Sequence, residues 1–565
     1  MNFSQLVDQL ITNTTEHSLW CFAPELAISV TIVMLLVIRL VSLDRFVPNY
    51  MFALLGTFAA FGLSLRQGYQ FATAEESLAG TFFTGLMVYD QFTIFFRVFL
   101  LLFLILTITL TVLTGIPDNE DGPDFYTLLL GATLGMMMMA GANHLLMLFL
   151  AIEMASVPSY VMVGFLKGRK DSSEAALKYV VYGAGTAGVM LYGISLLSGL
   201  LGTGELPEIA SRIAILVQGD AASAAAVGIS DGTVRAIVMA IMLVMVGLAF
   251  KLSLVPFHFW CPDAFEGASA EVGGFLSVAS KAGAFALLLR FVLAFSGDLS
   301  NPSALSEVYM YLGLGLGAVG AVTSTYGNLT AYAQSNIKRM LAYSTIAHAG
   351  YMIMAVSALV VILNAPDDTI DKVAAGGRAI EGLLYYLAVY MFMNLGAFAV
   401  VALIRNQTFS EDIKDYNGIA SQAPWLCICM LICMFSLIGM PPFGGFFAKL
   451  MIFASVYQAG LKVHWFMYVV LVFGGMNTVF SLFYYLRVLK AMFIGERPAE
   501  ARPVKVGFHP SVYVMTLAAF VLLLGLFPAW MQGLSSRASD AANEVLTPQA
   551  QIVQPIGDTV AQDVR

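Results

Sequence analysis

Charged residues are scarce in this sequence. Asp, Glu, Lys and Arg together make up only 11% of its 565 residues, whereas 59% are hydrophobic. Soluble globular proteins carry about 25% charged residues, so the composition excludes an ordinary soluble enzyme. The mean hydropathy is +0.82, and apolar runs long enough to cross a bilayer recur along the chain. These features predict an all-α polytopic membrane protein.

Signatures of several functional classes are also lacking. The five cysteines have neither disulfide nor metal-site spacing, and Cys427, Cys429 and Cys433 share one apolar run, which indicates packing. No basic patch indicates nucleic acid, and the glycine-rich runs lack the strand that a phosphate loop needs. The first twenty residues contain no Lys or Arg, so we expect no signal peptide. We therefore expect no redox, metal or cofactor site in this chain.

Apolar runs of about 20 residues predict about fourteen transmembrane helices. They are expected near residues 22–42, 47–65, 86–115, 125–142, 144–166, 175–201, 236–259, 269–297, 307–329, 337–363, 381–405, 424–457, 463–493 and 510–532. Several exceed one straight span, so we expect them to tilt, break or extend beyond the hydrocarbon.

The distribution of Lys and Arg predicts the orientation. These residues are more frequent in the loops after odd-numbered helices, which places those loops in the cytoplasm and both termini outside. Two long segments then lie outside as well. Residues 202–235 are expected to form a loop with room for one surface helix, and the polar tail 534–565 is expected to be partly disordered.

Lys251 is the strongest candidate site. It lies near the end of an apolar run that begins at Ala236, and Pro256 follows five residues later. Proline removes a helical hydrogen bond, so we expect the seventh helix to break just beyond the lysine. A charge at bilayer depth costs about 2.5–3.5 kcal/mol on insertion scales, and broken helices mark ion pathways. Because burial disfavours a charged ammonium, Lys251 could exchange protons, with Glu153 as its switchable partner.

Glu153 lies in an apolar run and is interpreted as a proton site or a partner of a lysine, with a structural ion pair as the alternative. Lys281 has small neighbours and no nearby interface, which favours a proton relay. Lys178 is near the start of its helix, so relay and snorkelling to the interface both stay open. His258 and His348 can each transfer protons or serve as satisfied structural groups.

A second break is expected just before Lys449, which is the last candidate site residue along the sequence. Two prolines and two glycines interrupt the twelfth span, namely Pro441, Pro442, Gly444 and Gly445. Breaks five helices apart predict two five-helix repeats, helices 4–8 and 9–13. The chain then divides into residues 1–124, a first repeat 125–298, a second repeat 299–493, a last helix in 494–533 and the tail. The repeats match imperfectly, because Lys251 precedes its break and Lys449 follows.

Other charges receive structural interpretations. Asp90 and Arg97 share a face of the third helix and are predicted to form a structural pair, and Arg290 is expected to reach the outer headgroups. Asp263 and Glu266 are expected to be solvated or to cap a helix.

Three segments resemble subunit N of proton-pumping NADH–quinone oxidoreductase, respiratory complex I. They run from Ala249 through Lys281, from Ile337 to Tyr351 and from Gly439 to Lys449. The resemblance covers about residues 80–500 and implies a fourteen-helix, antiporter-like subunit with two inverted repeats. The family's functional residues fall on Glu153, Lys178, Lys251, Lys281 and Lys449. A lysine at the last position distinguishes the chain from the sister subunit M.

The resemblance also implies the cofactors and partners. FMN, iron–sulfur clusters and quinone would reside in other subunits and none in this chain. Partners would be subunit M, small subunits such as K and J, and the lipid bilayer of a bacterial-type inner membrane, with no nucleic acid. Two alternatives remain: a subunit of a multisubunit Na⁺/H⁺ antiporter, or a structural membrane subunit that moves no protons.

Overall fold

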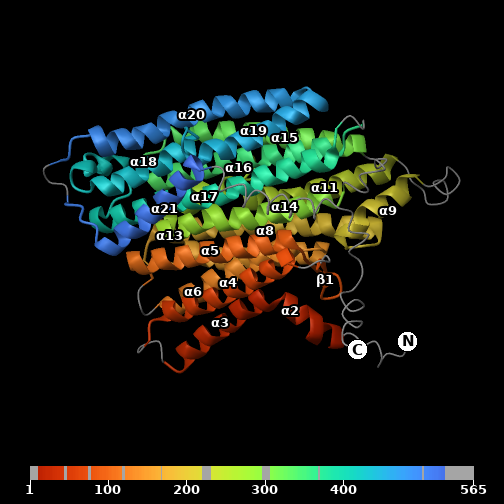
Figure 1. Cartoon of the computed structure of the whole chain (residues 1–565), viewed down its shortest axis with the longest axis horizontal. Helices are drawn as coiled ribbons and strands as arrows, with labels where there is room; N and C mark the ends of the chain where they lie inside the picture. The colour runs from red at the N-terminus through yellow and green to blue at the C-terminus, as the bar shows by residue number, and fades with distance from the viewer. Residues whose placement is uncertain are drawn as a thin grey trace.

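The fold is a bundle of membrane-spanning helices. The computed structural model describes residues 11–42, 47–73, 78–117, 121–166, 168–218, 231–295, 306–366, 370–498 and 502–527. Most helices lie side by side along the long axis of the molecule (Figure 1). Within the described residues, twelve helices are long and apolar enough to cross a membrane. The predicted class, an all-α polytopic membrane protein, is confirmed.

The spans follow the predicted order. Their bounds are α3 Ala23–Leu40, α4 Asn49–Thr73, α5 Gln91–Thr114, α6 Gly122–Gly141, α7 Leu145–Val163, α8 Lys170–Leu201, α11 Asp231–Leu252, α15 Ser306–Ala331, α16 Ile337–Leu363, α17 Lys372–Thr408, α20 Phe466–Ile494 and α21 Phe508–Leu526. The eighth span comprises α13 Ala270–Phe275, the π-helix η3 Leu276–Ser280 and α14 Lys281–Leu293. The twelfth comprises α18 Pro424–Ile438 and α19 Gly444–Lys462. The total of fourteen stays a prediction, because α4 and the α18–α19 pair lie outside the twelve.

Shorter elements lie at the helix ends. They are the π-helix η1 Thr14–Ser18, α2 Leu19–Cys21, the strands β1 Gly80–Phe82 and β2 Met87–Tyr89, α9 Leu206–Gln218, α12 Trp260–Gly267, and the 3₁₀ turns η4 Ile413–Tyr416 and η5 Ile419–Ser421. The antiparallel pairing of β1 with β2 was not predicted. It corrects the third span, which begins at Gln91 rather than at residue 86.

The described part of the segment between helices six and seven contains the helix α9, as its composition allowed. Residues 219–230 and the tail 534–565 lie outside the described residues.

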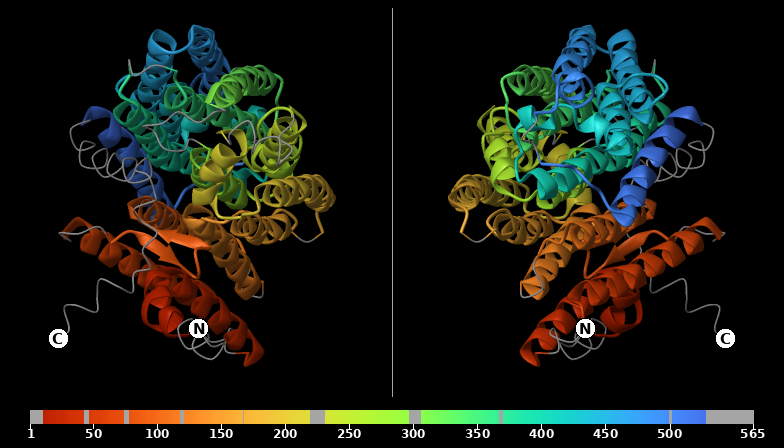
Figure 2. Two further views of the ribbon diagram at one scale, coloured as in Figure 1. Left: turned by 90° about the vertical axis from the view of Figure 1, so that its right-hand side faces the viewer. Right: turned by 90° about the vertical axis from the view of Figure 1, so that its left-hand side faces the viewer.

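The helices α16 and α17 form the centre of the bundle. In their most apolar 18-residue stretches, 100% and 94% of the residues are buried. Figure 2 shows α3 and α4 at the edge of the bundle, beyond α5 and α6. The central helices are therefore the ones that any buried polar path must use.

Candidate functional site

The first break separates α11 from α12. The α-helix ends at Leu252, and Ser253 has a left-handed backbone conformation with φ 59°. This conformation is strained for residues other than glycine and occurs mainly at functional sites. The Trp260 indole donates to the carbonyl oxygen of Phe250 at 2.9 Å, and the Val255 amide donates to Thr323 Oγ1 of α15 at 3.1 Å. The break that contains Pro256 is thus tied to its own helix and to a neighbour.

Lys251 is buried in the last turn before this break, with 1% of its surface exposed. Its ammonium donates to Ser156 Oγ on α7 at 3.0 Å. Glu153 lies three residues before Ser156, about one helical turn away, and its carboxylate and Lys251 interact electrostatically. No direct ion pair joins the two among the described residues. The serine therefore holds the lysine close to, but apart from, its predicted partner.

Lys281 lies on another helix and contacts the end of α11 at the first break. It is buried, follows directly after the π-helix η3, and donates to the carbonyl oxygen of Leu252 at 2.9 Å. A helix C-terminus carries a partial negative charge, so the ammonium is placed where α11 favours a cation. Lys281 also donates to the carbonyl oxygen of Thr345 on α16 at 3.2 Å. It thereby joins the two predicted repeats.

Lys449 makes the same kind of contact at the second break. Its ammonium donates to the carbonyl oxygens of Leu437 and Ile438, the last two residues of α18, at 3.1 and 2.9 Å. It also lies 4.6 Å from the centre of the Tyr351 ring, a cation–π distance. By its contacts Lys449 therefore corresponds to Lys281, which also caps a half-helix, rather than to Lys251.

Backbone packing fixes the second break. Pro441 and Pro442 lie in the turn between α18 and α19, and the Gly445 amide donates to Ser436 Oγ at 3.0 Å. A Cβ at Gly445 would lie 1.9 Å from the Ser436 carbonyl oxygen, and one at Gly444 would meet Val389 at 3.1 Å. Gly445 is required because the two half-helices approach this closely, whereas Gly444 allows α19 to pack tightly against α17.

His348 lies on α16, one turn beyond the carbonyl that receives Lys281. Both Lys281 and Lys449 act on it electrostatically. Its Nδ1 shares a hydrogen bond with Tyr386, and its Nε2 lies 3.3 Å from the hydroxyl of Tyr485. The histidine is buried within the electrostatic reach of both lysines, and its own hydrogen bonds go to the two tyrosines rather than to either lysine.

His258 lies within the first break and is buried, with 2% of its surface exposed. Its ring packs on Tyr326 with 4.5 Å between centroids, and its Nδ1 has no hydrogen-bond partner among the described residues. No hydrogen bond between described residues joins it to Lys251 or Lys281. The structure thus places His258 in the break, against Tyr326 of α15, without connecting it to the lysines.

Lys178 lies apart from the buried set. Its side chain is 42% exposed and pairs with Glu174 at 2.7 Å and Asp263 at 2.9 Å. Arg339 pairs with Asp263 and Glu266, each at 2.6 Å. Burial by itself would raise the pKa of Asp263, but its hydrogen bonds from Lys178 and Arg339 hold that pKa below its ordinary value. This position matches the interfacial alternative for Lys178, and the solvated or capping role expected for Asp263 is replaced by an ion-pair network.

Lys338 is a further buried lysine that the sequence did not single out. It is fully buried at the start of α16. Its ammonium pairs with Glu411 at 2.8 Å and donates to the carbonyl oxygen of Ala268 at 2.6 Å. A charge at a helix end normally indicates a solvated loop, so the sequence held no local signal of this burial.

The predicted pairing of Asp90 with Arg97 is wrong. Arg97 pairs with Glu25 of α3 at 2.6 Å, whereas Asp90 pairs with Arg290 of α14 at 2.7 Å. Arg290 is 4% exposed and does not reach the headgroups as expected. Both ion pairs are buried, and each joins two helices that are distant in the sequence. Residue spacing within one helix could not predict which helices they join.

The described residues contain no cluster of three or more His, Cys, Asp or Glu side chains arranged to hold a metal ion. All five cysteines are free and buried. The arrangement brings together amines, imidazoles and hydroxyls, which are groups that can bind and release protons.

The comparison with known proteins agrees with this arrangement. A family model of the membrane domain of NADH:quinone oxidoreductases and Mrp antiporters matches residues 142–476. A protein of Anaeromyxobacter sp. (strain Fw109-5), named NADH-quinone oxidoreductase subunit N, is 38% identical over 538 residues, covering 92% of this chain and 96% of that protein. The chain belongs to the subunit N family.

Another subunit N, from Chlorobium chlorochromatii (strain CaD3), is 35% identical and covers 92% of this chain and 93% of its own. A chain of respiratory complex I from Thermus thermophilus has a TM-score of 0.67 and 29% identity, with 90% and 98% covered. A chain of the Mrp complex from Dietzia sp. DQ12-45-1b has a TM-score of 0.75 at 18% identity, covering 96% and 100%, which shows a shared fold. The chain is thus an antiporter-like membrane subunit of an H⁺-translocating NADH–quinone oxidoreductase, and other subunits of that complex are its partners.

Proposed function

We propose that this subunit carries protons along a path from the half-buried Glu153 through the buried residues Lys251, Lys281, His348 and Lys449. One observation carries the proposal: Lys281 and Lys449 each cap the end of a broken helix, and His348 lies between them. Burial costs an ammonium several kcal/mol. Hydrogen bonds to a charged group return about 1.5–3 kcal/mol each. These opposing effects keep the charged and neutral amines close in energy.

Protons would be loaded at Lys251. Moving a unit charge to within about 4 Å changes the energy by about 4 kcal/mol at an effective dielectric constant of about 20. The Ser156 contact holds Lys251 without direct contact to Glu153, so a small approach of the carboxylate would favour the charged amine. Its withdrawal would release the proton toward Lys281. His258, beside the break, would serve as a branch of this path, and Lys178 would stabilise its entry.

The surroundings of the subunit are proposed on the same basis. Subunit M and the small subunits K and J would be the neighbours, in a bacterial-type inner membrane with both termini outside. FMN, iron–sulfur clusters and quinone would reside in other subunits, which supply the driving reaction. Residues 125–298 and 299–493 would act as two linked half-units, with the helices of 1–124 and 494–533 at their edges.

The test is Lys251→Ala in the assembled complex, with the exposed Lys170→Ala as the matched control. Proton uptake and NADH oxidation are recorded together in proteoliposomes. We expect a lower ratio of protons to electrons in Lys251→Ala and an unchanged ratio in Lys170→Ala. An unchanged ratio in Lys251→Ala refutes the role.

Na⁺/H⁺ antiport is a second candidate, because the fold is shared with the Mrp complex. It predicts Na⁺-dependent proton movement without any quinone. A structural subunit, by contrast, predicts that Lys251→Ala and Lys449→Ala alter assembly at most and leave the ratio of protons to electrons intact. The same proteoliposomes, assayed with and without Na⁺ and quinone, distinguish all three.

A further inference from the structure

A cavity lies between α11, α14, α15 and α16, remote from the proton path. Its empty space, together with the open space at its mouth, amounts to about 530 Å³. Its residues come from the middle of α11, the start of α15 and the ends of α14 and α16. The predicted orientation places these helix ends in the outer leaflet.

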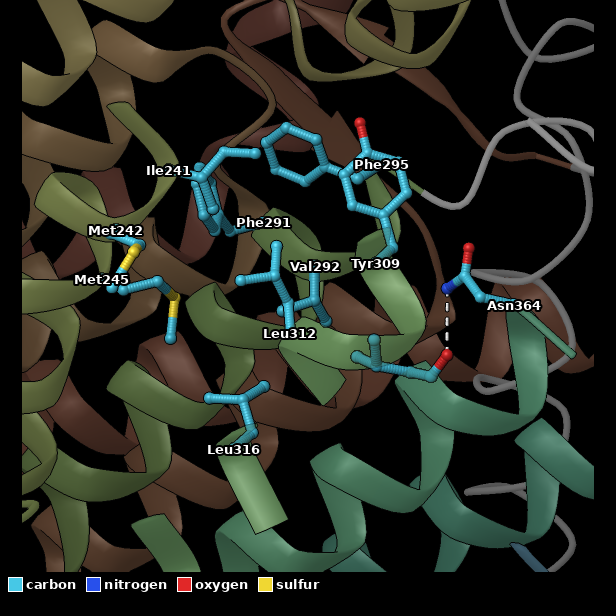
Figure 3. Close-up of a pocket in the computed structure, with 11 residues that line it drawn as sticks. Ile241, Met242, Met245, Phe291, Val292, Phe295, Tyr309, Leu312, Leu316 and Asn364 are labelled. Carbon is cyan, nitrogen blue, oxygen red and sulfur yellow. Dashed lines mark hydrogen bonds between the residues drawn. The ribbon is translucent and has the colours of Figure 1, made fainter. Parts of the chain in front are cut away.

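The lining is almost entirely apolar (Figure 3). Met245 lies on one side, Phe291 and Leu312 form the floor, and Tyr309 closes the other side. Asn364 contributes a polar group, but its amide already donates to the carbonyl oxygen of Val360 at 2.9 Å. A cavity of this lining does not hold water favourably.

Tyr309 offers the unused polar group. Only 4% of its surface is exposed, and its hydroxyl has no hydrogen-bond partner among the described residues. Leaving a buried hydroxyl unpaired is costly. An occupant that brings one acceptor to an otherwise apolar cavity would satisfy it.

The mouth faces the membrane. Met242, on the rim, is 59% exposed and belongs to α11, which spans the membrane. Side chains exposed on such helices meet lipid or another transmembrane helix. A helix is about 10 Å across, so little more than one helical turn would fill 530 Å³. The cavity is therefore too small to hold a transmembrane helix.

We propose that this cavity binds one acyl chain of a membrane phospholipid. The chain lies along Met245 and Leu312, and the ester carbonyl at its polar end accepts a hydrogen bond from the Tyr309 hydroxyl. The bound chain packs between α11 and α14 of the first predicted repeat and α15 and α16 of the second. This inference rests on the cavity alone and does not depend on proton transport.

The experiment uses the purified complex and a phosphatidylglycerol whose acyl chain carries a photoactivatable diazirine. After illumination, labelled peptides are mapped by mass spectrometry. Labelling is expected in segments 241–245 and 309–316. Leu312→Trp fills the cavity and should lower this labelling at least tenfold. Val322→Trp, on the lipid-facing side of the same helix and 54% exposed, should leave it unchanged.

Two further variants complete the test. Tyr309→Phe removes only the hydroxyl and should reduce labelling about threefold, the loss of one weak hydrogen bond. Met245→Phe replaces Leu312→Trp if that variant does not assemble. Equal labelling in the filled and control variants overturns the proposal. So does labelling spread evenly over exposed spans, or displacement of the probe by a free fatty acid or a long-chain quinone but not by unlabelled phospholipid.

Discussion

Replacing Gly445 by alanine should force apart the two half-helices, α18 and α19, that meet at the second break. The added Cβ would lie 1.9 Å from the carbonyl oxygen of Ser436. Ordinary contact begins at about 3.4 Å, so α18 and α19 must separate by roughly 1.5 Å. The Gly445–Ser436 hydrogen bond of 3.0 Å and the Lys449 contacts of 2.9 and 3.1 Å would then exceed hydrogen-bond distance. Overpacking of this kind costs about 1–3 kcal/mol.

The assay has two readings. Native gels report how much complex assembles, and proteoliposomes report the ratio of protons to electrons. We expect assembly to continue at a reduced level and the ratio to fall. Gly475→Ala is the matched control, because a Cβ at that position in α20 has nothing within 4 Å. If Gly445→Ala behaves like Gly475→Ala in both readings, the close approach of the half-helices does not position Lys449, and the reasoning fails.

Three other predictions concern charges. Asp90→Asn should destabilise the complex by about 3–5 kcal/mol, measured by thermal unfolding, because it leaves the Arg290 charge buried without its partner. Ser156→Ala removes the acceptor of Lys251 and should slow proton pumping about tenfold, measured as initial rate, since hydrogen bonds to a charged group contribute about 1.5–3 kcal/mol. Asp263 has a pKa below its ordinary value, so its ion pairs contribute stability above that ordinary value. This contribution should fade as the pH drops below about 4, measured as the difference in melting temperature from Asp263→Asn.

Each of these has a control. Asp90 and Asp371 are both helix N-caps, and asparagine caps as well as aspartate, so Asp371→Asn should change stability little. Ser156→Thr retains the hydroxyl and should pump normally, and full pumping by Ser156→Ala would contradict the assigned contact. A difference from Asp263→Asn that grows on acidification would reverse the expected sign.

The parts of the site that the sequence predicted are those with a local cause. A lysine inside an apolar run is costly unless it is buried by protein, and a proline weakens the helix around it, so Lys251, Lys281, Lys449 and the break at Pro256 could be located without a structure. A proline alone does not decide the outcome, because α7 continues through Pro158. The hydrophobic runs gave the order of the spans for the same reason. The bounds differ where a polar turn extends a helix or where the β1–β2 pair precedes α5.

The errors come from contacts between distant segments. Asp90 and Arg97 are seven residues apart, about 10.5 Å along a helix, too far for an ion pair. Their true partners lie 200 and 72 residues away in the sequence. Lys338 resembles a loop charge until Glu411 covers it. Spacing within one helix specifies which residues share a face, but only the packing of the bundle specifies what that face meets.

The most direct test of the account is the ratio of protons to electrons in Lys449→Met. Methionine keeps the length of the side chain and removes the amine that caps α18. Lys462→Met, at the exposed end of the same helix, is the control. The account predicts a reduced ratio for Lys449→Met and a normal one for Lys462→Met, with both complexes assembled. A normal ratio in an assembled Lys449→Met complex would contradict it.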